Sequence, residues 1–269
     1  MNKGKPFIRI LIITLPVILV IILIAYAQLV KTTPEMKSLT PDNEGFIPIF
    51  DGATLNDWEG DSTYWRVEDG SLVGEITPAT ILDRNTFIIW TGGTPGDFEL
   101  KLSFRISANG NSGINYRSEP VEGISFALRG YQCDIDGQNH YTGQNYEERK
   151  RTTLAYRGQQ VVLQTPEDEA GGNLLDNHIQ HNAWQPAEVK SSLGDPDSLL
   201  HHVRAGDWNE CHLIVRGNRM QHFVNGVLMS DVTDNDTLHR TLSGLIGVQV
   251  HVGPPMKVEY RDIRIKEFK

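Results

Sequence analysis

The stretch GYQCDID, residues 130–136, alternates apolar and polar side chains from its second residue onward. Successive side chains of a β-strand point to opposite faces, so Gln132, Asp134 and Asp136 would share one face of such a strand. The side chains on the opposite face are Tyr131, Cys133 and Ile135. This stretch is therefore predicted to be a strand with one apolar face and one polar, ionisable face.

Two other stretches have the same alternation, NSGINYR at 111–117 and GVQVHVG at 247–253. Their polar side chains fall in one register, which contains Asn111, Asn115, Arg117, Gln249 and His251. Amides, a carboxylate, a guanidinium and an imidazole on one face are the groups that a sugar-sized ligand requires. The alternative is that these strands simply expose a solvated polar face, as the outer strands of many sheets do.

The rest of the chain continues the β pattern. DFELKLSFRIS, residues 97–107, alternates strictly and predicts a half-exposed antiparallel strand. Asp69-Gly70, Gly217-Asn218 and Asn225-Gly226 lie between short alternating runs and indicate tight turns. Short strands separated by such turns, with few helical periods, predict an all-β sandwich or jelly roll.

Two segments depart from that pattern. Residues 195–202 begin with Asp-Pro and predict a short surface helix, because aspartate caps helices and proline suits the first helical position. Residues 167–188 form a long polar loop that contains His178, His181 and Trp184. The two histidines have helical spacing but no compact third ligand, so we predict no metal site and no cofactor. Trp184 is the best candidate for stacking against a sugar.

Composition limits the class of protein. The chain has 269 residues, of which 39% are hydrophobic and 22% charged, enough for one large domain with its own core. Its formal charge of −9 argues against nucleic acid or an anionic membrane surface as a partner. The two cysteines, Cys133 and Cys211, lie in apolar registers and are predicted to be buried free thiols, with a disulfide as the alternative.

The amino terminus predicts export. Three basic residues are followed by an uncharged apolar run from Ile10 to Tyr26, and Ala25-Tyr26-Ala27 matches a signal-peptidase site. The run is nearly long enough to span a bilayer, so membrane attachment through an uncleaved anchor is the alternative. We therefore divide the chain into a signal peptide or anchor at 1–27, a linker at 28–44 and one domain at 45–269, which would lie in the periplasm or outside the cell.

Several blocks of sequence resemble one family from about Gly45 to Phe268. They are FIPIFDGATLNDW, YWRVEDGSLVGE, FELKLSFRISANGNSGINYRS, the 130–136 stretch, NYEERKRTTLAYRGQ, GDWNECHLIVRGNRMQHFVNGV and VHVGPPMKVEYRDIRIKEF. Together they are similar to the 3-keto-disaccharide hydrolase domain family. The resemblance implies a jelly-roll β-sandwich of the concanavalin or laminin-G type with its ligand on the concave sheet face. The 167–188 loop departs from the family and looks like an insertion.

The resemblance also implies a glycoside-cleaving enzyme that acts on 3-keto-glycosides or related sugars. A 3-keto group acidifies the proton on C2, so a base could remove it, the glycosidic oxygen could leave from C1, and water could then add. Asp134 or His251 could be the base, and Glu148 in the YEER segment is the candidate acid. The candidate substrate-binding residues are Asn111, Arg117, Gln132, Gln249 and Tyr146.

Other interpretations of the same residues stay open at this stage. A carboxylate pair could hydrolyse the glycoside directly. A jelly roll could also serve as a non-catalytic carbohydrate-binding module, since fold alone does not give activity. The charge run from Glu147 to Arg151 is typical of a solvated segment. The ionisable side chains on the predicted site strands favour the enzyme.

Overall fold

The computed structural model describes residues 41–166, 180–181 and 187–268. The predicted signal peptide or anchor, most of the predicted linker, His178 and Trp184 lie outside these described residues. Within the described part of the chain, no helix is long and apolar enough to cross a membrane.

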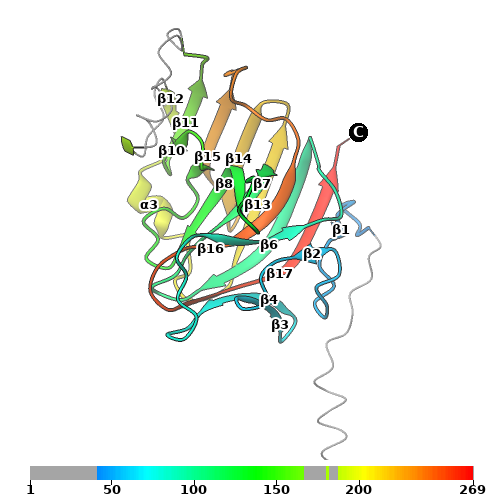
Figure 1. The fold of residues 1–269 in the computed structure, drawn as a ribbon. Coiled ribbons are helices and arrows are strands. Elements are labelled where there is room, and N and C mark those ends of the chain that lie inside the picture. The colour runs from blue at the N-terminus through cyan, green and yellow to red at the C-terminus, as the bar shows by residue number, and fades with distance from the viewer. Residues whose placement is uncertain (1–40, 167–179, 182–186, 269) are drawn as a thin grey trace, which may run out of the picture. The chain divides into compact units, whose positions relative to one another are not determined.

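The larger of two sheets has ten strands among the described residues (Figure 1). In spatial order they are β12 (Ala187–Ser192), β11 (Gln159–Leu163), β15 (Val227–Asp234), β14 (Arg219–Val224), β13 (Asn209–Arg216), β6 (Phe98–Ile106), β17 (Met256–Glu267), β4 (Ser71–Ile76) and β3 (Trp65–Glu68), with β1 (Ile47–Pro48) also paired to β17. Neighbours are antiparallel except β11 and β15, which are parallel. The strict alternation of 97–107 appears here as β6, whose side chains are alternately buried and partly exposed.

The smaller sheet has seven strands in the same part of the chain. Its spatial order is β10 (Thr152–Ala155), β9 (Asn145–Glu148), β8 (Leu128–Asp136), β7 (Asn111–Pro120), β16 (Leu245–Val250), β5 (Thr86–Trp90) and β2 (Trp58–Glu59). The three stretches that the sequence groups together are thus the adjacent strands β8, β7 and β16, all antiparallel.

The core lies between the sheets. Tyr131, Cys133 and Ile135 on the apolar side of β8 are almost completely buried in it. Across the core, the Sγ atom of Cys133 lies 3.8 Å from that of Cys211 on β13, and both are free thiols, as predicted. The two sheets therefore bury their apolar registers against each other, and the all-β jelly-roll sandwich expected from the alternation is confirmed.

The predicted helix is α3 (Pro196–Leu200). The Asp195 carboxylate accepts a hydrogen bond from the Ser198 N–H at 2.8 Å, which is the expected N-cap, and Leu199 is the buried residue of the helix. The helix thus packs on the sandwich through one leucine, and its other residues stay at or near the surface.

Candidate active site

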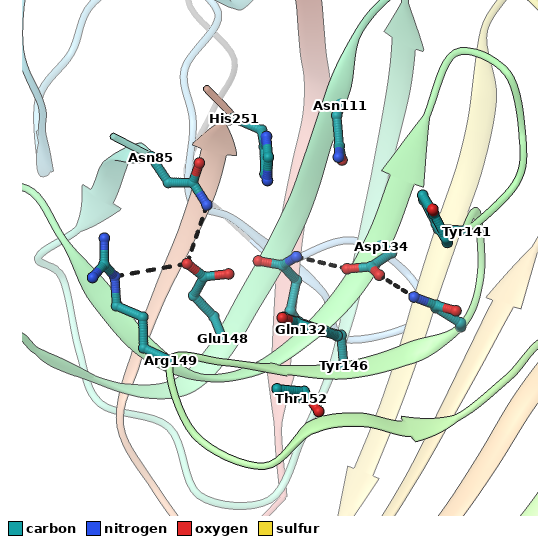
Figure 2. Close-up of a pocket in the computed structure, with 11 residues that line it drawn as sticks. Asn85, Asn111, Gln132, Asp134, Tyr141, Tyr146, Glu148, Arg149, Thr152 and His251 are labelled. Atoms are coloured by element: carbon teal, nitrogen blue, oxygen red, sulfur yellow. Dashed lines mark hydrogen bonds and ion pairs between the residues drawn. The ribbon is translucent and has the colours of Figure 1, made fainter. Parts of the chain in front are cut away.

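Polar side chains of β7, β8 and β9 border a cavity of about 460 Å³. Eleven described residues line it: Asn85, Asn111, Gln132, Asp134, Tyr141, Gln144, Tyr146, Glu148, Arg149, Thr152 and His251 (Figure 2). Six of the eight predicted site residues are among them. Asp134, His251 and Glu148, the three candidate catalytic residues, therefore come to one cavity from β8, the end of β16 and β9.

Asp134 lies at one side of this cavity and is buried. Its Oδ1 accepts a hydrogen bond from the Gln132 side-chain amide at 2.6 Å, and its Oδ2 accepts one from Gln144 at 2.5 Å. Burial first, and then the negative charges of Glu148 and Asp136, raise the pKa of Asp134, and the two amide hydrogen bonds lower it; the net result is a pKa of about 7. A carboxyl group with this pKa can take or give a proton at neutral pH.

A chain of amides fixes the orientation of Gln132. The Gln249 amide, fully buried on β16, donates to the Gln132 Oε1 at 3.3 Å, so the Gln132 nitrogen faces Asp134. Gly113 on the intervening strand β7 leaves room for this side chain, since a Cβ at that position would collide with Gln132. Gln249, predicted from sequence to bind substrate, does not line the cavity and instead donates its hydrogen bond to Gln132.

Glu148 lies at the opposite side of the cavity from Asp134 (Figure 2). Its Oε1 accepts a hydrogen bond from the Asn85 amide at 3.1 Å, and the Arg149 Nε lies 3.7 Å from the same oxygen. Asn85 in turn accepts the Val252 N–H at 2.9 Å, which ties the segment after β16 to this carboxylate. Glu148 therefore has both a neutral donor and a cation beside it.

His251 follows β16 directly and lies between Asn85 and Asn111 in the view of Figure 2. Its Nδ1 is 2.7 Å from the Val252 carbonyl oxygen. A carbonyl oxygen only accepts hydrogen bonds, so Nδ1 carries the proton in neutral His251, and Nε2 keeps a lone pair. This tautomer would let Nε2 accept a proton from a bound molecule.

Two hydroxyl groups complete the polar wall. Burial raises the pKa of Tyr146, and the charges of Glu148 and Asp134 raise it further, so its phenol stays protonated and can donate a hydrogen bond. The Thr152 hydroxyl is buried and has no hydrogen-bond partner among the described residues. Both groups could bind oxygen atoms of a ligand.

Arg117 does not belong to this site, which corrects its assignment from sequence. It is 1% exposed, and its guanidinium donates to the carbonyl oxygens of Gly96 and Gly217 and to the Asp97 carboxylate. Its φ of 45° coincides with a register shift between β7 and β8 just after Tyr116. This bulge breaks the strict alternation on which the prediction depended.

The charge run 147–151 is also not the solvated segment that its composition indicates. Glu147 and Arg151 are fully buried, with the Arg151 Nε 2.5 Å from the Glu147 Oε2. Arg151 also contacts Asp234 at 2.6 Å and Asp236 at 3.2 Å. We call Glu147, Arg151, Asp234 and Asp236 the buried ion cluster.

The buried ion cluster holds the turn that supplies the cavity with side chains. Two of the four cluster residues are sequence neighbours of lining residues, since Glu147 precedes Glu148 and Arg151 precedes Thr152. Arg149 and Thr152 have φ values of 56° and 66°, a backbone region that costs free energy in residues other than glycine. The contacts of Glu147 and Arg151 hold the two ends of this turn.

Sequence reasoning missed five lining residues, namely Asn85, Tyr141, Gln144, Arg149 and Thr152. Tyr141 and Gln144 follow the 130–136 stretch in the polar segment GQNHYTGQ, so their position after a predicted site strand was an available signal. Asn85 has no such signal, because it precedes β5 and reaches Glu148 from 63 residues away in sequence. In the described part of the chain, no group of three or more His, Cys, Asp or Glu residues could hold a metal ion.

Two solved structures from Parabacteroides distasonis ATCC 8503, whose names propose glycosyl hydrolases, have a similar fold. One is 18% identical and covers 87% of this chain and 100% of its own, with a TM-score of 0.52. The other is 16% identical and covers 83% and 99%, with a TM-score of 0.51. At this level of identity the likeness extends to the fold alone.

Sequence similarity is more specific. A 3-keto-disaccharide hydrolase from Bacteroides thetaiotaomicron is 32% identical over 141 residues, which are 44% of this chain and 46% of that protein. The match thus spans about half the length of that relative. The profile of the 3-keto-alpha-glucoside-1,2-lyase-like domain matches residues 45–266. Because this match covers most of the chain, the protein belongs to the 3-keto-alpha-glucoside-1,2-lyase-like family.

Proposed function

We propose that this protein cleaves 3-keto-glycosides by elimination across C1 and C2, followed by addition of water. The family is one of sugar-cleaving domains, and a relative carries the name 3-keto-disaccharide hydrolase. The observation that carries the proposal is Asp134, a buried carboxyl group with a pKa of about 7 at the wall of a polar cavity. Such a group can accept a proton from carbon when a neighbouring carbonyl acidifies it.

In the proposed reaction, Asp134 takes the proton from C2, and the electron pair moves into the 3-keto group to form an enolate. The enolate then expels the oxygen at C1, and Glu148 gives that oxygen a proton. Water adds to the resulting C1–C2 double bond: Glu148, now a carboxylate, takes a proton from the water as the hydroxyl joins C1, and Asp134 gives a proton to C2, so both groups regain their starting states. The net result is hydrolysis, and no oxidant or reductant is consumed.

The other cavity residues have roles that match their geometry. The Asn111 amide and the protonated phenol of Tyr146 can donate hydrogen bonds to the enolate oxygen or to ring hydroxyls. Gln132 is committed to Asp134, so it orients the base. His251, with Nε2 free to accept, is the second candidate base and could also take the proton of the added water.

The experiment that tests this function compares a 3-keto-disaccharide with its unoxidised parent. The purified protein should release monosaccharides only from the keto form, because the parent sugar has no acidic C2 proton. Cleavage of both sugars at similar rates would favour direct hydrolysis by carboxylates. Binding without cleavage of either would favour the non-catalytic carbohydrate-binding module.

We also propose that the protein is exported, on the basis of residues 1–27. Amino-terminal sequencing of the mature protein is expected to begin at Gln28, directly after Ala25-Tyr26-Ala27. A protein that starts at Met1 and fractionates with membranes would show that the segment is kept as an anchor. A protein that starts at Met1 and stays in the cytoplasm would contradict export.

A further inference from the structure

We propose that Tyr141 is the aromatic platform for the sugar ring on which Asp134 acts. This inference rests on the proposed function and names the part of the substrate that Tyr141 recognises. Tyr141 lines the cavity and is nevertheless 46% exposed, which leaves much of its ring open to solvent. A pyranose ring has C–H groups on its faces and hydroxyls at its edge, so a tyrosine ring can cover a face while amides and carboxylates bind the edge.

The backbone that carries Tyr141 is held from one side by Asp136. The Asp136 carboxylate accepts hydrogen bonds from three successive N–H groups, those of His140 at 3.0 Å, Tyr141 at 2.9 Å and Thr142 at 3.1 Å. Asp136 is buried at the end of β8 and does not line the cavity. Its carboxylate therefore orders the loop and is not used on a ligand.

Arg157 holds the same loop by hydrogen bonds to backbone carbonyl oxygens. Its guanidinium donates to the carbonyl oxygens of Asn139 at 3.1 Å and Thr142 at 3.0 Å, and also to that of Pro196 at 3.0 Å. Arg157 is 7% exposed and has no part in the proposed chemistry. With N–H and C=O groups of its backbone bound on both sides, the loop is held before a ligand binds, which lowers the ordering cost of binding at Tyr141.

The position of Tyr141 determines which sugar ring it contacts. The Gly143 N–H donates to the Asp134 carbonyl at 2.9 Å, so the loop is joined to the backbone of the proposed base. Figure 2 shows Tyr141 beside Asp134, with Glu148 and Arg149 at the far side of the cavity. A ring on Tyr141 would present C2 to Asp134, and the leaving group would extend toward Glu148. Tyr141 is therefore assigned to the keto-bearing ring.

The test measures kcat and KM for the wild type, Tyr141→Ala and Tyr141→Phe with two substrates, a 3-keto-disaccharide and a methyl 3-keto-glucoside. Tyr141→Ala is expected to raise KM about tenfold for both substrates and to change kcat less than about twofold, because a stacking contact binds ground and transition states alike. Tyr141→Phe keeps the ring and should stay within about twofold of the wild type. Tyr156→Ala is the matched control, since Tyr156 is 51% exposed but does not line the cavity.

Three results would overturn the assignment while leaving the function in place. The first is an unchanged KM in Tyr141→Ala, and the second is an equal rise of KM in Tyr156→Ala. The third is a rise of KM in Tyr141→Ala with the disaccharide but not with the methyl glucoside, which would place Tyr141 under the leaving sugar. If the wild type cleaves neither substrate, the proposed cleavage is wrong. Calorimetric titration with the 3-keto-disaccharide then tests separately whether Tyr141 stacks against the sugar. If Tyr141→Ala binds this sugar about tenfold more weakly than the wild type, the stacking role is supported. If the two proteins bind it equally, or the wild type does not bind it, the stacking role is overturned.

Discussion

Asp134 is the base in the proposed reaction. Two glutamine amides fix its carboxylate, and burial raises its pKa to about 7. Asp134→Asn keeps the shape of the side chain but removes its basicity, so kcat should fall by roughly two to four orders of magnitude while substrate binding is retained. Steady-state kinetics and calorimetric titration check the two parts. A variant that binds substrate and keeps wild-type kcat would show that Asp134 is not the base, and His251 would take its place.

The raised pKa of Asp134 also predicts how stability depends on pH. The folded protein binds this proton up to pH about 7, whereas the unfolded chain releases it near 3.8. The contribution of Asp134 is therefore fully present below pH 3.8 and is lost as pH rises through 7, with a total of up to about 4 kcal/mol. Asparagine does not titrate, so the free energy of unfolding of Asp134→Asn, relative to wild type, should increase between pH 4 and 8. Urea denaturation across this range measures it, and parallel pH profiles would contradict the raised pKa.

At the scale of elements, the turn between β9 and β10 depends on the buried ion cluster. Arg151→Met removes the guanidinium that contacts Glu147, Asp234 and Asp236, and leaves Lys150 beside Glu147 and His239 beside Asp236. The free energy of unfolding should fall by about 3–5 kcal/mol. Arg129→Met is the control, because the Arg129–Glu119 pair is about half exposed on both sides and should contribute less than about 1 kcal/mol. Equal losses in the two variants, measured by chemical denaturation, would contradict a special role for the cluster.

The same elements show how far side-chain alternation can predict a site. It placed Asn111, Gln132 and Asp134 correctly, because β7 and β8 are regular where these residues lie. It failed at Arg117, where a bulge with positive φ directs the guanidinium to Gly96 and Gly217. A bulge depends on the pairing of two strands, so alternation along one strand cannot reveal it.

Burial within one element was equally hard to predict. Composition alone makes the run from Glu147 to Arg151 look solvated, yet the strand alternation separates Glu147 from Glu148. Glu147 faces the core and Arg151, and Glu148 faces the cavity and Asn85. Two further acidic partners of Arg151, Asp234 on β15 and Asp236 just after it, are more than 80 residues away in sequence. Local charge patterns carry no information about such distant partners.

For the whole molecule, the fold followed from the sequence because the period of two recurs in nearly every segment and places apolar registers toward one core. The site was only half predictable, because several of its residues do not lie on strands with this period. Residues on regular strands of the smaller sheet could be grouped by register, whereas Asn85 and Tyr141 reach the cavity from loops. Their positions depend on hydrogen bonds such as those of Asp136 and Arg157 to the 137–143 loop.

The elimination route makes a demand that direct hydrolysis does not. The C2 proton must leave the substrate for Asp134, and a proton must return to C2 when water adds; exchange of the Asp134 carboxyl proton with heavy water brings deuterium to C2. The most direct test is the reaction of a 3-keto-disaccharide in heavy water, with the released keto-sugar analysed by NMR or mass spectrometry. The account predicts one deuterium at C2 of each released keto-sugar, and a slower reaction when the substrate carries deuterium there. Product that keeps its original C2 hydrogen, together with an unchanged rate for the substrate deuterated at C2, would contradict elimination and favour direct hydrolysis.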